Sequence, residues 1–143
     1  MTDPSAWGPS LWRTMHTFAH AYPPYAPDDA TRAAAEAFYE SLPLLMPCAE
    51  CAQWCAQWLH RFPVRDAAFD RDRLARWVYT MHCAVNAKLG KPNTVSYDQA
   101  RQWYERASNG VSIHARPVRF ASLKDARGDP LLITSSFQQQ MRI

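Results

Sequence analysis

Apolar side chains recur at three- and four-residue steps along most of residues 5–107, which is the spacing of one buried helix face. An aspartate, Asp70 or Asp72, can cap the start of the longest stripe, and Gly90 followed by Pro92 can end it. We therefore predict a helix from Asp70 or Asp72 to Gly90. Its apolar face consists of Leu74, Trp77, Val78, Met81, Val85 and Leu89.

The same pattern predicts four further helices. Proline ends a helix because it has no backbone N–H to donate, and Ser-x-x-Gln forms a capping box at a helix start. The four are a helix over about 5–21 that stops at Pro23-Pro24, one from Asp28 or Asp29 toward Ser41 that ends at Leu42-Pro43, one opened by Pro47 and Cys48 that reaches about Arg61, and a short one from Ser96 to about Ala107.

Composition agrees with a helical protein. Only four of the 143 residues are glycine, and the 48% of apolar residues is an ordinary globular proportion. We expect an all-α fold, a four-helix bundle with a short fifth helix, in one domain over 1–110. Residues 111–143 lack sustained periodicity and are expected to form a partly irregular C-terminal extension.

Charge and hydropathy exclude several classes of function. The net charge of +3 comes with no recognised nucleic-acid-binding motif, so we expect no nucleic-acid partner. No apolar run approaches the roughly 20 residues of a membrane-spanning helix. The N-terminus shows no secretory pattern, which predicts a cytoplasmic protein.

The strongest chemical feature is the pair Cys48 and Cys51, two thiols at the start of a predicted helix. The helix N-terminal field stabilises a thiolate there, which favours redox chemistry, but zinc sites use the same spacing. The spacing alone leaves redox, metal and incidental roles open. Cys55 and Cys83 are either small buried apolar residues or partners in a disulfide that joins the third and fourth helices.

Four sequence blocks, in order, resemble the Erv/ALR family of FAD-linked sulfhydryl oxidases. They are Trp7-Gly8-Pro9-Ser10-Leu11-Trp12-Arg13-Thr14-Met15-His16 with Ala19 and Tyr22-Pro23; Leu42-Pro43 and Pro47 before Cys48-Ala49-Glu50-Cys51; His82-Cys83-Ala84-Val85-Asn86-Ala87-Lys88-Leu89-Gly90-Lys91-Pro92; and Trp103. The resemblance covers about residues 5–107. The compact form looks most like the versions encoded by large DNA viruses, which would place the protein in the host cytoplasm or the virion.

The resemblance implies a noncovalently bound FAD beside Cys48 and Cys51, usually within a homodimer. The implied cofactor contacts are Gly8, Trp12, His16, Tyr22, His82, Cys83, Asn86, Lys88, Lys91 and Trp103, with no metal. Cys83 departs from the family pattern, because an asparagine commonly follows the motif histidine.

The implied activity is disulfide formation in substrate proteins. Cys48 would exchange with the thiols of a substrate protein or of a partner oxidoreductase, Cys51 would face the flavin, and electrons would pass through FAD to oxygen and give hydrogen peroxide. Two rivals remain at this stage: a zinc-stabilised helical module held by the four cysteines, and a helical interaction protein whose Trp-rich face docks a partner.

Overall fold

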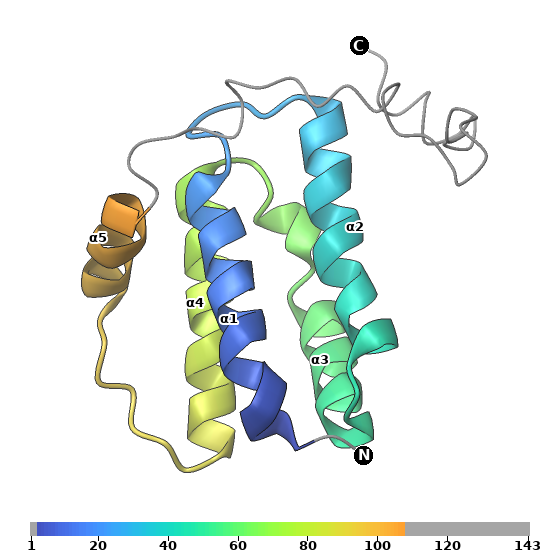
Figure 1. Ribbon diagram of the computed structural model, residues 1–143. Helices are drawn as coiled ribbons and strands as arrows, with labels where there is room; N and C mark the ends of the chain where they lie inside the picture. Colours follow the sequence, from blue (N-terminus) through green and yellow to red (C-terminus); the bar gives the residue numbers. More distant parts are fainter. Residues whose placement is uncertain (1–2, 108–143) are drawn as a thin grey trace, which may run out of the picture.

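The computed structural model describes residues 3–107. All regular secondary structure in this part of the chain is helical (Figure 1). Helix α1 packs mainly against α4, α2 packs against α3, and α5 lies outside the α1/α4 pair. The predicted four-helix bundle with a short fifth helix is therefore confirmed. The elements are α1 (Pro4–Ala21), α2 (Asp29–Leu45), α3 (Ala49–Arg61), the short 3₁₀ helix η1 (Val64–Asp66), α4 (Arg71–Lys88) and α5 (Tyr97–Ala107).

Short-range capping starts the helices close to where the sequence predicts. Asp28 Oδ1 accepts a hydrogen bond from the backbone N–H of Thr31 at 2.7 Å, and Asp70 Oδ1 accepts from that of Arg73 at 2.8 Å. Each cap satisfies one N–H that the first helical turn leaves unpaired. At α5 the predicted capping box forms in both directions, by Ser96 N–H to Gln99 Oε1 and Gln99 N–H to Ser96 Oγ.

The predicted end of the second helix is wrong. Helix α2 continues through Pro43 to Leu45, and the backbone N–H of Met46 still donates to the carbonyl of Leu42 at 3.0 Å. Proline keeps φ near its helical value, and Pro43 removes a single backbone N–H from the helix, so the residues after it can still be helical. The extra turn carries the exposed Leu44 and Leu45 up to the segment that precedes Cys48.

The core lies between the two helix pairs. Met15 of α1, Tyr39 of α2 and Leu74 of α4 are each 1% exposed. The Tyr39 hydroxyl donates to the carbonyl of Met15 at 2.8 Å, which links the pairs through a buried hydrogen bond. Among the described helices, none has the length and apolar character needed to cross a membrane.

Candidate functional site

A cavity of about 940 Å³ lies between α1, α3, α4 and α5 and is also lined by the segment that joins α4 to α5. This volume falls within the roughly 300–1,000 Å³ of small-molecule and cofactor sites. Most of the residues predicted to contact a cofactor lie on its wall. They are Gly8, Trp12, His16, His82, Cys83, Asn86, Lys88, Lys91 and Trp103.

A disulfide joins Cys48 and Cys51, whose Cα atoms are 5.2 Å apart. Cys48 is the N-cap of α3, and its Sγ accepts a hydrogen bond from the backbone N–H of Cys51 at 3.2 Å. Cys51 lines the cavity, whereas Cys48 is only 7% exposed and does not line it. The pair therefore presents one of its two sulfurs to the cavity.

Stacked rings form the wall that α1, α4 and α5 share. The rings of Trp12 and His82 lie parallel, with centroids 4.1 Å apart and planes 5° apart. His82 Nδ1 is 2.9 Å from His16 Nε2, and the ring of His16 stacks on Tyr104 at 5.2 Å. The wall thus combines flat apolar faces with hydrogen-bonding nitrogens.

The two histidines are neutral near pH 7. Burial, with smaller contributions from His82 and His20, lowers the pKa of His16 to about 3. Burial also lowers the pKa of His82, with a smaller contribution from Lys91. One ring N–H therefore donates to the other ring, so the pair acts as hydrogen-bonding groups rather than as charges.

The cavity wall also carries positive charge. Lys88 and Lys91 line the cavity, and Lys88 Nζ lies 3.1 Å from Glu50 Oε1, the carboxylate between the two disulfide cysteines. Glu50 is 82% exposed, so this ion pair is a solvated surface contact. Asn86 Nδ2 donates to Asn93 Oδ1 at 3.0 Å and holds the segment after α4 beside the cavity.

The proposed Cys55–Cys83 disulfide is wrong. Both thiols are free, and both line the cavity. The cavity therefore separates α3 from α4 at the place where a bridge would have to join them. Burial raises the pKa of Cys55 to about 11, which keeps it a protonated thiol near pH 7. Within residues 3–107 no group of three or more cysteine, histidine or acidic side chains is arranged to hold a metal ion.

Tyr22 lies away from the cavity. Its side chain is 5% exposed in the core, and its hydroxyl donates to the carbonyl of Ala68 at 3.0 Å. The wall also includes Trp7 and Tyr104, which the sequence did not predict as cofactor contacts. Tyr104 directly follows Trp103, and a tertiary contact with α1 rather than any local pattern brings its ring onto the wall.

These features define a helical protein with a disulfide on the wall of an aromatic cavity that two lysines also line. The sequence profile of the Erv1 / Alr family matches residues 9–112. The chain belongs to this family.

Named relatives and solved structures agree with this assignment. A protein of Invertebrate iridescent virus 3 assigned as an FAD-linked sulfhydryl oxidase is 33% identical over 90 residues, which span 63% of this chain and 60% of that protein. The mitochondrial FAD-linked sulfhydryl oxidase ERV1 of Saccharomyces cerevisiae is 32% identical over 59% of this chain, but the match spans only 43% of its own length. The crystal structure of the yeast Erv1 core superposes with a TM-score of 0.63 and 26% identity, over 78% of this chain and 88% of that one.

Proposed function

We propose that this protein is an FAD-linked thiol oxidase that forms disulfides in substrate proteins. The observation that carries the proposal is the position of Cys51, which is half of a disulfide and at the same time part of the cavity wall. A disulfide placed in this way can exchange with thiols on one side and pass electrons to a ligand on the other.

The cavity fits FAD by chemistry as well as by volume. Trp12 and Trp103 offer flat faces for the ring systems, and Lys88 and Lys91 can neutralise the pyrophosphate. The Nδ1 atom of His16 is buried on this wall without a hydrogen-bond partner among the described residues, as is Nε1 of Trp7. A buried polar atom without a partner is costly, and a ligand that hydrogen-bonds to it removes that cost.

The residues proposed to hold FAD follow from this wall. They are Gly8, Trp12, His16, His82, Cys83, Asn86, Lys88, Lys91 and Trp103. Tyr22 is left out of the set because its side chain is occupied in the core.

Cys48 takes the substrate step in this scheme, because Cys51 faces the cavity. A substrate thiolate attacks Cys48 Sγ, forms a mixed disulfide with it and releases Cys51 as a thiolate. The second substrate thiol then attacks the substrate sulfur and releases Cys48, so the substrate gains a disulfide and the chain's pair gains two electrons. The N-terminal field of α3 stabilises the thiolates, since Cys48 is its N-cap.

FAD held by the cavity wall would supply a two-electron acceptor for the reduced Cys48–Cys51 pair, with oxygen as the final acceptor and hydrogen peroxide as the product. The neutral His16 and His82 contribute hydrogen bonds and exclude water from the wall. Lys88 offsets the charge of Glu50, which would otherwise oppose a thiolate between the two cysteines.

The test begins with the purified full chain. We expect it to retain a flavin that is released on denaturation, and to consume oxygen with a dithiol substrate. Cys51→Ser should retain the flavin and lose dithiol-dependent oxygen consumption to background. A chain that binds no FAD, or a Cys51→Ser protein that still turns over, would contradict the proposal.

The substrate is expected to be a thiol-containing protein or a partner oxidoreductase, with molecular oxygen as the second substrate. Assembly as a homodimer, a cytoplasmic location, and the host cytoplasm or virion for a virus-encoded protein stay predictions, as does the division at residue 110. The predicted extension at 111–143 lies outside the described residues.

A further inference from the structure

Helix α5 supplies one wall of the cavity, yet its position does not follow from chain connectivity. The segment from Leu89 to Ser96 between α4 and α5 forms no helix or strand. Figure 1 shows α5 beside the bundle at the end of this long connection. Side-chain contacts must therefore determine where α5 lies, and with it Trp103 and Tyr104.

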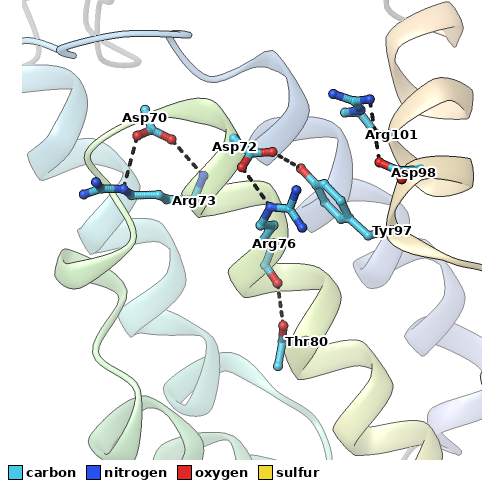
Figure 2. A network of polar contacts seen from close by, with 8 residues as sticks. All are labelled: Asp70, Asp72, Arg73, Arg76, Thr80, Tyr97, Asp98 and Arg101. Carbon is cyan, nitrogen blue, oxygen red and sulfur yellow. Dashed lines mark hydrogen bonds and ion pairs between the residues drawn. The ribbon is translucent and has the colours of Figure 1, made fainter.

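Polar side chains of Asp72, Arg76 and Tyr97 join α4 to α5 in a cluster, called the α4–α5 cluster here (Figure 2). The Tyr97 hydroxyl donates to Asp72 Oδ1 at 2.8 Å, and Arg76 Nε donates to Asp72 Oδ2 at 2.8 Å. The Arg76 guanidinium carbon also lies 4.1 Å from the centre of the Tyr97 ring. Each member thus contacts both others, which fixes the Tyr97 ring in direction as well as in place.

Tyr97 is suited to set the position of α5. It is the first residue of the helix and only 9% exposed, although most of α5 faces solvent. Its ring packs edge-on against Tyr79 of α4 at 5.6 Å and lies 6.3 Å from His20 of α1. One side chain therefore anchors the start of α5 to both helices of the α1/α4 pair.

The anchored end lies within two helical turns of the cavity. Ala100, Trp103 and Tyr104 of α5 all line it, and the ring of Tyr104 stacks on both His16 and His20. Trp103 is 54% exposed and has no core packing of its own to hold it over the cavity. Its position depends on how α5 is held.

We propose that Tyr97, held by Asp72 and Arg76, is a positioning residue that sets α5 as a wall of the cofactor cavity. The inference rests on the proposed function, because the ligand of the cavity is taken to be FAD. Tyr97 itself lines no part of the cavity, so its effect on the cofactor passes through Trp103 and Tyr104.

The test uses Tyr97→Phe in the full chain, which removes one hydroxyl and keeps the ring. We expect the dissociation constant for FAD, measured by flavin fluorescence, to rise about tenfold, which corresponds to about 1.4 kcal/mol. Excess FAD should restore the rate constant for turnover. Amide hydrogen exchange in cofactor-free protein should become faster in 97–107 and stay unchanged in α2 and α3.

The matched control is Tyr39→Phe, which removes a buried tyrosine hydroxyl bonded to the backbone carbonyl of Met15 in α1, a contact that involves no residue of α5. It should lower the thermal midpoint while leaving FAD affinity and exchange in 97–107 unchanged. Asp72→Asn is the second variant, since it keeps Tyr97 intact but weakens the acceptor, and it decides the question if Tyr97→Phe does not fold.

The outcomes separate the two proposals. A wild-type chain that binds no FAD contradicts the proposed function, while the exchange measurement still judges the role of Tyr97. A wild-type chain that binds FAD, with affinity and α5 exchange unchanged in both variants, overturns the positioning role. Equal losses of affinity in Tyr97→Phe and Tyr39→Phe also overturn it, because a general loss of stability would then explain the effect.

Discussion

Cys51 and Cys55 lie one helical turn apart on α3 and line the same cavity, but only Cys51 belongs to a disulfide. The difference is chemical as well as geometric. Cys51 bonds to a cysteine at the helix N-cap, whereas Cys55 is 1% exposed and burial raises its pKa to about 11. A buried protonated thiol is a poor nucleophile.

We therefore expect Cys55→Ala to keep most of the thiol oxidase turnover that Cys51→Ser loses. The substitution should lower the free energy of unfolding by about 1 kcal/mol, comparable to the removal of one buried methylene. Urea denaturation and oxygen-electrode assays on the same preparations check both parts. A Cys55→Ala protein with the stability of the wild type but without turnover would show that Cys55 takes part in electron transfer.

His16 makes the free energy of unfolding depend on pH, and its buried environment sets the direction of that dependence. Its pKa falls to about 3 in the folded chain from 6.5 for an ordinary histidine, so between these values the unfolded chain binds more protons. The stability that the neutral His16 contributes is fully present above about pH 6.5 and is lost as the pH falls toward 3. From pH 6.5 to 5 we expect the free energy of unfolding to drop by about 1–2 kcal/mol from this group.

Urea denaturation at several pH values measures the slope of the free energy of unfolding against pH. His16→Gln should flatten it, because glutamine does not titrate. Tyr39→Phe is the control: it should lower the whole curve without changing its slope, since its hydroxyl does not titrate in this range. Equal slopes in wild-type and His16→Gln proteins would contradict the interpretation.

At the scale of single elements, helix starts depend on local chemistry, as α4 shows. Asp70 caps α4 through the backbone N–H of Arg73, and its Oδ2 lies 3.3 Å from Arg73 Nε. Asp70→Ala should lower the free energy of unfolding by about 1 kcal/mol. Asp66→Ala, an exposed aspartate four residues earlier that caps no α-helix, should change it much less. Thermal or urea unfolding checks both, and equal losses would mean that the cap contributes nothing of its own.

This dependence explains which elements the sequence could predict. The caps of α2, α4 and α5 need only residues within three positions, so the pattern located their starts. The end of α2 was missed because proline weakens a helix without always ending it, and α2 contains Pro43. Tyr104 was not predicted on the cavity wall and Tyr22 lies away from it, because contacts with distant residues decide where an aromatic ring points.

At the scale of the whole molecule, the cavity lies where the two helix pairs meet. Helices α1 and α4 form one wall of the cavity, and α5 forms another. Helix α3 lines the cavity with Cys51, Trp54 and Cys55. The motifs spaced along the chain therefore form a single site only after α2 and α3 fold back on the first helix. Most of the cofactor contacts implied by the family resemblance lie on the cavity wall, while the structure supplied their arrangement and the remaining wall residues.

A ligand that fills this cavity contacts four helices at once, so it should stabilise the whole bundle. At a free FAD concentration 100 times the dissociation constant, mass action adds about 2.7 kcal/mol to the free energy of unfolding. For a chain of this size that raises the thermal midpoint by roughly 10 °C.

Riboflavin, which lacks the pyrophosphate and adenine, cannot reach Lys88 and Lys91 in the same way and should give a smaller shift. Thermal unfolding of cofactor-depleted protein with each compound measures the difference, and equal shifts would mean that Lys88 and Lys91 do not bind the pyrophosphate.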